Sequence, residues 1–324
     1  MRKVYYNAKF VDETEAHISI YDSALMFGDM IFEMTRSFNK EQFKLREHLE
    51  RLYSSARYLR MNLEGVMTMD EMEHAVYETI RVNEENFEDD DEHRIMIDVT
   101  RGLLSIYQDV VGTHKGLNII IADFPLKWTV RGMGELFDKG INAVIPSQRA
   151  IPASLLDPKV KNRSRIHYLM ANMQVSNYEG NNNWALLLDT DNFIAEGTGD
   201  NFFIVKNGVL YTPEPRNILR GISREYVFKL ADMMGIEYHE CNLDVYDVVN
   251  ADEAFMTGTP FCILPVTTLD RQSIGTGKVG PMVQELIKKW GATVGVDIVA
   301  QIKEWNRKFD GNGEITVSPY SFKK

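Results

Sequence analysis

Residues 195–203 read AEGTGDNFF and lie between two stretches of strand-forming residues. The preceding residues Phe193–Ala195 predict one short strand, and Phe202–Val205 predict the next. The residues that follow Glu196 are small, so the backbone of another segment can approach the Glu196 carboxylate closely. The stretch therefore predicts a strand, a close turn and a second strand, with an acidic side chain that another group can approach.

The second half of the chain contains three further segments in which polar residues and glycines interrupt apolar runs. They read VKNRSRIHY at 160–168, YTP at 211–213 with NILRGISR at 217–224, and DEAFMTGT at 252–259 with ILPV at 263–266. Within the second segment, Gly221, Ile222 and Ser223 are expected to begin a helix, and a helix N-terminus offers N–H groups to an anion. Most of the candidate functional residues therefore lie beyond residue 150.

The composition is that of an ordinary globular protein. Of the 324 residues, 44% are hydrophobic and 26% are charged, which argues against a disordered chain and suggests about two domains. The 36 basic and 47 acidic side chains give a net charge of −11, so we expect no nucleic-acid or membrane partner. Two cysteines, an N-terminus without an apolar signal and no apolar run of membrane-helix length predict a cytoplasmic protein.

Both halves of the chain mix predicted strands with predicted helices. The strands expected in the first half are Val4–Val11, Ile18–Ile20, Glu33–Phe38, Gln42–Leu45, Ile95–Val99 and Leu117–Ala122. Helices are expected from Arg46 to Leu59 and from a capping box at Thr68 and Glu71. We place an α/β domain at 1–125, a linker at 126–139, and a second α/β domain at 140–324.

Several common functional patterns are absent from the sequence. It has no phosphate-binding GxxxxGK[ST] loop, no HExxH, no CxxC and no glycine-rich dinucleotide fingerprint. The seven histidines share no metal-ligand spacing, and the acidic run at 84–92, which we expect to be a solvated loop, shows no ligand pattern. We therefore predict no metal site.

Two segments of the first half complete a set of six that occur in a fixed order. They read FGDMIFE at 27–33 and REHLERLYSSA at 46–56. Together with the four regions of the second half, they resemble the class IV pyridoxal-phosphate aminotransferases, over roughly residues 3–290. That family includes branched-chain aminotransferases, D-amino acid transaminases, (R)-selective amine transaminases and aminodeoxychorismate lyase. The resemblance implies fold type IV, with a small N-terminal α/β domain and a larger C-terminal pseudo-barrel α/β domain.

The resemblance implies pyridoxal 5′-phosphate as the cofactor and Lys161 as the catalytic residue. A lysine must form a Schiff base with this cofactor and then move the α-proton of the substrate. Lys159 is the neighbouring competitor, but the Lys-x-x-Ser-Arg-Ile and Val-Lys-Asn patterns around Lys161 favour Lys161. Glu196 is expected beside the pyridine nitrogen, which must stay protonated for the ring to withdraw electrons.

Further cofactor contacts follow from the same resemblance. Arg51 and the N-terminus of the helix after Gly221 would bind the phosphate, Leu219 would pack on the ring and Asn201 would support Glu196. The cofactor-binding residues expected in full are Arg51, Lys161, Glu196, Asn201, Leu219, Gly221, Ile222, Ser223, Gly258 and Thr259.

The substrate-binding residues expected are Phe27, Phe32, Arg36, Arg94 and Pro260. D-amino acid transaminases have an Arg-x-His pair where this chain has Ile106 and Gln108, and a tyrosine in place of Phe32. Branched-chain enzymes have an arginine at the position of Arg94 and a Phe-Glu-x-x-Arg run. Pro260 has no N–H with which to hold a carboxylate. The cations that could replace that donor are Arg36, Arg94, Arg101, Arg163 and Arg165.

We therefore predict an aminotransferase that moves an amino group from a branched-chain or other hydrophobic L-amino acid to a 2-oxo acid such as 2-oxoglutarate. An (R)-selective amine or D-amino acid transaminase is the alternative, and a lyase similar to aminodeoxychorismate lyase is a further one. A non-catalytic binding protein with the same fold is the hypothesis from another class. The resemblance also implies a homodimer, and we expect residues 103–113 to form a loop near the site.

Overall fold

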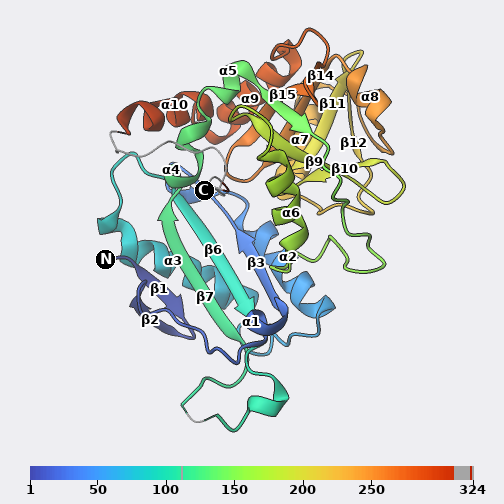
Figure 1. Cartoon of the computed structure of the whole chain (residues 1–324). Coiled ribbons are helices and arrows are strands. Elements are labelled where there is room, and N and C mark those ends of the chain that lie inside the picture. The colour runs from blue at the N-terminus through green and yellow to red at the C-terminus, as the bar shows by residue number, and fades with distance from the viewer. Residues whose placement is uncertain (111, 310–321, 323–324) are drawn as a thin grey trace. The chain divides into compact units, whose positions relative to one another are not determined.

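The computed structural model describes residues 1–110, 112–309 and 322, which form two compact units (Figure 1). The first unit contains residues 1–126 together with Val160–Arg165, and the second contains 127–159 and the chain from Ile166 onwards. The segment with Lys161 thus belongs to the first unit although it comes later in the sequence. Within the region expected as a linker, α4 (Lys127–Val130) and α5 (Leu136–Lys139) are helical and belong to the second unit.

The first unit is built on a five-stranded antiparallel sheet in the order β2-β1-β7-β6-β3. Its strands are β1 (Lys3–Tyr6), β2 (Lys9–Asp12), β3 (Met30–Met34), β6 (His93–Thr100) and β7 (Asn118–Pro125), and β4 (Ser37–Phe38) and β5 (Glu41–Gln42) form a separate hairpin. Its helices are α1 (Ser23–Phe27), α2 (Leu45–Tyr58) and α3 (Met69–Asn83), with 3-10 turns at Glu84–Asn86 and Ser105–Tyr107.

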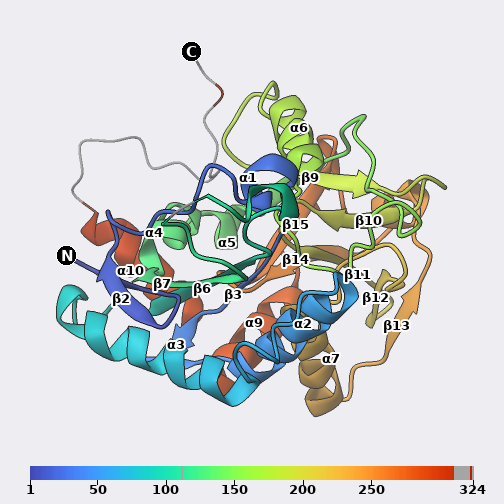
Figure 2. The ribbon, with the colours of Figure 1, turned by 90° about the horizontal axis from the view of Figure 1, so that it is seen from below.

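Helices α2 and α3 lie on the same side of this sheet (Figure 2). Alternate residues of a strand point to opposite faces, so Ile31 and Glu33 of β3 share a face with their β6 partners Val99 and Ile97. Ile31 and Ile97 pack there with Leu49 of α2 in one buried cluster, together with residues of α3. The opposite face carries Phe32 and Asp98, which are paired across β3 and β6. The hydrophobic core therefore leaves the Phe32 face of the sheet for other contacts.

Some strand predictions in the first unit were wrong. The expected strand Val4–Val11 is a hairpin, because Asn7 and Ala8 adopt positive φ angles of 47° and 65° between β1 and β2. Ile18–Ile20 forms no strand, since the chain instead enters α1, where the Asp22 carboxylate caps the helix by accepting from the Ala24 N–H. The expected strand Glu33–Phe38 is divided between β3 and β4.

Other predictions for this unit are confirmed. Asn39 and Lys40 form the turn between β4 and β5, with φ angles of 52° and 68°. Helix α2 lies one residue from its expected bounds, and Thr68 and Glu71 form the capping box that begins α3. The expected strand Leu117–Ala122 is β7, which continues to Pro125. Of the loop expected at 103–113, Val111 lies outside the described residues, as do 310–321, 323 and 324 of the C-terminal domain.

The second unit is built on a nine-stranded sheet. Its strands are β8 (Ile141–Val144), β9 (Asn183–Leu188), β10 (Ile194–Gly197), β11 (Asn201–Lys206), β12 (Val209–Pro213), β13 (Tyr238–Cys241), β14 (Glu253–Gly258), β15 (Cys262–Leu269) and β16 (Gln272–Ser273). Its longer helices are α6 (Ile166–Val175), α7 (Ile222–Met234), α9 (Pro281–Val294) and α10 (Ile298–Lys308), and α8 (Val245–Val249) is short.

Six of these strands close into a ring, because β10 pairs with both β9 and β11. The ring runs β10-β9-β8-β15-β14-β11, and β12 and β13 extend it beyond β11. The pair that closes the ring joins Glu196 to Asn201, the two ends of the GTGD turn. The α/β composition and the barrel-like sheet of the second unit confirm the predicted fold class. Among the described residues, no helix is long and apolar enough to cross a membrane.

Candidate active site

Lys161 lies on a short extended segment that pairs with the edge of the first sheet. The Phe32 N–H donates to the Lys161 carbonyl at 3.0 Å, and the Arg163 N–H donates to the Met30 carbonyl at 2.9 Å. Asn162 is paired with Ile31, whose side chain faces the helices. Lys161 and Arg163, one residue to either side, therefore point to the opposite face, where Phe32 lies.

Three cations surround the Phe32 ring on that face. The Lys161 Nζ lies 4.8 Å from the ring centroid, and the guanidinium carbons of Arg163 and Arg165 lie at 3.7 and 5.5 Å. The electron-rich face of an aromatic ring attracts such cations. Asp98, the partner of Phe32 on β6, accepts from the Arg163 Nε at 2.9 Å. Burial raises the pKa of Asp98, and the charge of Arg163 opposes this effect.

Arg94 lies four residues before Asp98 on β6 and faces the same side of the sheet. Burial, followed by the positive charges of Arg36 and Arg163, lowers the pKa of Arg94 to about 10. Its Nε has no hydrogen-bond partner in the described part of the chain, and its Nη2 contacts the Met34 sulfur at 3.6 Å. Arg36 is also buried, and its guanidinium stacks on the Phe38 ring at 3.8 Å.

The helix-facing side of β3 carries a buried carboxylate, Glu33. Arg51 of α2 donates to both of its oxygens, from Nε at 2.6 Å and from Nη2 at 2.8 Å, and His48 Nδ1 lies 2.7 Å from Oε2. Burial raises the pKa of Glu33, but Arg51 and His48 more than offset this and hold it below its usual range. Glu33 thus fixes the orientation of Arg51, the arginine expected to bind phosphate. Ser55 of the same helix accepts from the Lys161 N–H at 3.3 Å.

Replacing Glu33 by glutamine is expected to lower the free energy of unfolding by about 3–5 kcal/mol, because Arg51 loses its carboxylate partner in a buried setting. Urea denaturation measures this change. Glu47→Gln is the matched control: Glu47 pairs with Lys44 in a half-exposed setting, and its loss should cost less than about 1 kcal/mol. Equal effects of the two substitutions would contradict the prediction. Since the pKa of Glu33 is lowered in the fold, its contribution is present at neutral pH and is lost as the pH falls below about 4.

In the second unit, three donors hold the buried carboxylate of Glu196. The Tyr168 hydroxyl donates to Oε1 at 2.8 Å, and the Asn201 side-chain amide and the Leu219 N–H donate to Oε2 at 3.1 and 3.0 Å. Asn201 also donates to the Leu219 carbonyl at 3.0 Å, which joins β11 to the loop before α7. Three donors favour the ionised carboxylate, which is the form needed beside a protonated pyridine nitrogen.

The N-terminus of α7 fits the phosphate of the expected cofactor. Its N-cap, Gly221, provides no side-chain cap, yet Ile222 and Ser223 of the first turn are buried. A Cβ atom at Gly221 would lie 2.1 Å from the Asn201 Oδ1, so only glycine allows this close approach. Buried, uncapped N–H groups at a helix start are suited to bind an anion. The donor set at this end of the unit therefore fits a phosphate group.

The remaining expected residues lie in two turns. Gly258 ends β14, and Thr259 and Pro260 follow in the half-buried turn before β15. A Cβ at Gly258 would lie 3.0 Å from the Phe261 ring. Phe27 is exposed at the end of α1, and its carbonyl accepts from the Ser164 hydroxyl at 3.3 Å. Among the predicted residues, Phe27, Phe32, Arg36, Arg51, Arg94 and Lys161 belong to the first unit, and the others belong to the second.

Four residues of this arrangement had no role in the sequence-based prediction. They are Asp98, which holds Arg163; His48, which contacts Glu33; Tyr168, which donates to Glu196; and Arg224. Arg224 is buried in the first turn of α7 and donates to the Pro213 carbonyl and to Glu240. Asp98 had a signal in the sequence, since a charge between Ile97 and Val99 marks the strand face away from the core.

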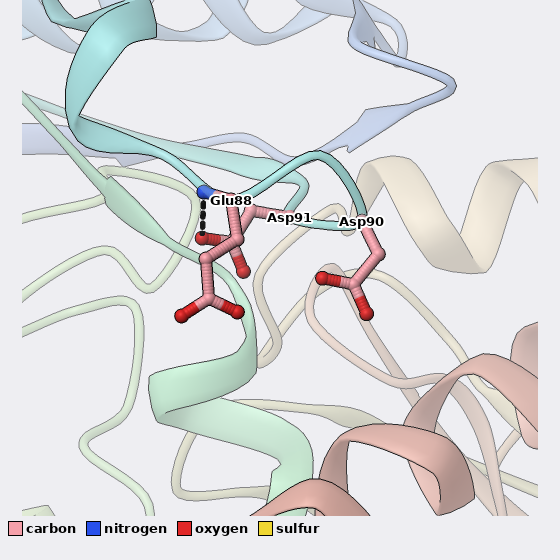
Figure 3. Close-up of side chains that lie close together, drawn as sticks. All are labelled: Glu88, Asp90 and Asp91. Carbon is pink, nitrogen blue, oxygen red and sulfur yellow. Dashed lines mark hydrogen bonds between the residues drawn. The ribbon is translucent and has the colours of Figure 1, made fainter.

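The acidic run at 84–92 differs in part from the expected solvated loop. Asp91 and Glu92 are buried, and Glu92 accepts from the Asn39 and Lys40 N–H groups at 2.8 and 3.0 Å. In the same run, ligand atoms of Glu88, Asp90 and Asp91 lie within 4.8 Å of one another (Figure 3). Asp91 accepts from the Glu88 N–H, and Glu88 is exposed. Such a cluster also occurs in ordinary acidic turns, and we assign no metal to it.

Comparison with known proteins places the chain in a family. The model of the class IV aminotransferase family matches residues 30–269. A putative branched-chain-amino-acid aminotransferase of Methanocaldococcus jannaschii is 40% identical over 289 residues, which cover 89% of this chain and 95% of that protein. The D-alanine aminotransferase of Bacillus licheniformis is 27% identical over 285 residues, covering 88% and 94%.

Solved structures agree with this placement. The branched-chain amino acid aminotransferase of Escherichia coli superposes with a TM-score of 0.78 at 29% identity, covering 91% of this chain and 94% of that one. The branched-chain amino acid aminotransferase of Thermobaculum terrenum, in its PLP-bound holo-form, has a TM-score of 0.77 at 27% identity, covering 94% and 97%. The predicted fold type IV is therefore confirmed. This chain belongs to the class IV aminotransferases, and it is an aminotransferase.

Proposed function

We propose that this enzyme transfers the amino group of a branched-chain or other hydrophobic L-amino acid to a 2-oxo acid such as 2-oxoglutarate. The branched-chain substrate is supported by the names of the Methanocaldococcus jannaschii and Escherichia coli relatives. A dicarboxylate as the second substrate is supported by the half-buried Arg94, whose buried Nε has no hydrogen-bond partner among the described residues. The proposed domain organisation is an N-terminal domain at 1–125, a linker at 126–139 and a cofactor-binding domain at 140–324.

The proposal of a dicarboxylate substrate rests on the surroundings of Arg94. A buried charge is costly unless an opposite charge compensates it, and the neighbouring charges that lower the pKa of Arg94 are Arg36 and Arg163, both positive. Its Nε lacks a hydrogen-bond partner among the residues described. A carboxylate at the far end of the substrate would supply both the charge and the acceptor. Leucine has no such group, whereas glutamate and 2-oxoglutarate do.

Class IV aminotransferases use pyridoxal phosphate, which supplies a ring that stabilises negative charge at the α-carbon of the substrate. We assign the cofactor phosphate to Arg51, Thr259 and the first turn of α7. The ionised Glu196 favours a proton on the pyridine nitrogen. Lys161 Nζ, which lies 4.8 Å from the Phe32 ring centroid, would carry a proton between the substrate α-carbon and C4′ of the cofactor. The transfer would run from the α-carbon to C4′ with the amino donor and in the reverse direction with the 2-oxo acid.

A homodimer and a cytoplasmic location are part of this proposal. The family resemblance supports the homodimer, and the presence of only two cysteines in the sequence supports the location. One experiment distinguishes the proposed function from its alternatives. The purified enzyme with pyridoxal phosphate is mixed separately with L-leucine, D-alanine and (R)-1-phenylethylamine, and its visible absorption is followed. Conversion of the cofactor by L-leucine supports the proposal. Conversion only by D-alanine or by the amine would replace it. Repeated turnover of aminodeoxychorismate to pyruvate, without any 2-oxo acid, would identify a lyase.

Replacing Arg94 by glutamine is expected to raise the KM for 2-oxoglutarate by about 10- to 100-fold, because a hydrogen bond to a charged group is lost. The KM for 4-methyl-2-oxopentanoate, which has no second carboxylate, should stay within about twofold, which makes this substrate the internal control. Steady-state kinetics with L-valine as the donor for both acceptors measures both constants, because L-valine has no distal carboxylate and regenerates neither acceptor. A parallel rise in the two KM values would contradict the assignment of Arg94 to the distal carboxylate.

A further inference from the structure

The Phe32 face of the first sheet holds a second arginine, Arg163, two residues from Lys161. We propose that Arg163 binds the carboxylate attached to the reacting carbon of both the amino acid and the 2-oxo acid. This inference rests on the proposed function, because it assigns one group of its substrates. Arg163 would thereby determine whether the enzyme prefers amino acids to simple amines.

The backbone places Arg163 beside the reacting amine. Residues 161–163 are extended along β3, so Lys161 and Arg163 lie on the same face with about 7 Å between their Cα atoms. Both side chains contact the same ring, with Nζ 4.8 Å and the guanidinium carbon 3.7 Å from the Phe32 centroid. In any amino acid the carboxylate carbon is one bond from the carbon at which Lys161 acts. A cation next to Nζ is therefore suited to this carboxylate.

Arg94 occupies a different place on the same face. Arg163 is hydrogen-bonded to Asp98 of β6, and Arg94 comes four residues before Asp98 on the same strand. Four residues of extended strand correspond to about 13 Å between the backbones of Arg94 and Asp98. The distance of Arg94 along the sheet suits the far end of a dicarboxylate, whereas Arg163 lies near the reacting end. Arg163 would thus bind the carboxylate next to the reacting carbon of 2-oxoglutarate, and Arg94 would bind the distal carboxylate.

Arg163 is fixed in position and retains unused donors. Its Nε donates to the Asp98 Oδ1, and its Nη2 lies 2.9 Å from the same oxygen, while Phe32 supports the face of the guanidinium. A guanidinium has five N–H groups, and the side chain of Arg163 makes no further hydrogen bond within the described ranges. Its side chain is 31% exposed, so an incoming ligand can reach the remaining donors. A preoriented donor binds with a smaller entropic cost.

The test compares ligands that carry or lack this carboxylate. 4-Methylvalerate has the carboxylate and side chain of leucine but no amine, and 3-methylbutylamine has the amine and side chain but no carboxylate. Titration calorimetry gives the Kd of 4-methylvalerate for the pyridoxal-phosphate-loaded wild type, Arg163→Gln and Arg163→Lys. Stopped-flow absorbance gives the concentration dependence of cofactor conversion by L-leucine and by 3-methylbutylamine.

Arg163→Gln should weaken 4-methylvalerate binding and raise the half-saturating L-leucine concentration, each by about 10- to 100-fold. The reaction with 3-methylbutylamine should be unchanged, and Arg163→Lys should show a smaller loss because it keeps the charge without the planar fork. Arg2→Gln is the matched control, since Arg2 pairs with Glu13 in a similarly half-exposed setting of the same unit.

Two results would overturn the inference. One is wild-type affinity of Arg163→Gln for 4-methylvalerate, and the other is an equal loss with L-leucine and 3-methylbutylamine. The melting temperature and the pyridoxal phosphate Kd of each variant establish that it is folded and loaded, and Arg163→Lys carries the test if Arg163→Gln does not fold. If no amino acid converts the cofactor of the wild-type enzyme, the proposed function itself is refuted, and no variant is needed for that conclusion.

Discussion

Replacing Lys161 by alanine is expected to reduce kcat by about 10³- to 10⁴-fold, because the group that moves the α-proton is lost. Lys161 is on the sheet edge beside β3, and its Nζ lies 4.8 Å from the Phe32 centroid. The backbone hydrogen bonds that join this segment to Met30 and Phe32 do not involve the amine. Lys161→Ala should therefore fold but lose its catalytic activity.

The matched control is Lys159→Ala, two residues earlier in the chain. Lys159 pairs with Asp157 at 2.9 Å and belongs to the second unit, so its loss should leave kcat within about twofold. A second readout is covalent retention of the cofactor after borohydride reduction and denaturation, expected for the wild type and for Lys159→Ala but not for Lys161→Ala. Retention by Lys161→Ala, or loss with Lys159→Ala, would transfer the catalytic role to Lys159.

Much of this architecture could be predicted from the sequence where a local pattern determines it. The spacing of Leu49, Leu52 and Ala56 predicted α2 to within one residue, and Thr68 with Glu71 predicted the start of α3. Both patterns depend on contacts within one or two turns of helix. The order of the six motifs predicted the family and the fold class, since their residue types match a known set of roles.

Other features were not predicted, because they depend on pairing between distant segments. Nothing local shows that residues 160–165 join the sheet of the first unit, or that β10 closes the ring by pairing with β11. The partners of the site residues were missed for the same reason: Asp98 and Arg163 are 65 residues apart, and Tyr168 and Glu196 are 28 apart. The expected strand at Ile18–Ile20 was wrong because three apolar-rich residues carry no information about an available pairing edge.

Replacing Glu196 by glutamine is expected to lower kcat by about 10²- to 10³-fold while the fold is retained. The loss arises because a neutral amide no longer favours a proton on the pyridine nitrogen of the cofactor. The fold should tolerate the change, since glutamine can keep its oxygen toward the Asn201 and Leu219 donors and place its NH₂ group against the Tyr168 hydroxyl, which can accept. Steady-state kinetics and thermal unfolding measure the two effects separately.

The matched control is Glu214→Gln, a carboxylate of the same unit that pairs with Arg216 at 2.7 Å in a half-exposed position. Its substitution should change neither kcat nor the melting temperature appreciably. Unchanged kcat in Glu196→Gln would show that another group protonates the ring. A large fall in melting temperature would show instead that Glu196 mainly stabilises the strand pair Glu196–Asn201 that closes the ring. Loss of kcat with an unchanged melting temperature is the result that assigns this carboxylate to the cofactor, because Asn201 then holds β10 to β11 without help from the charge.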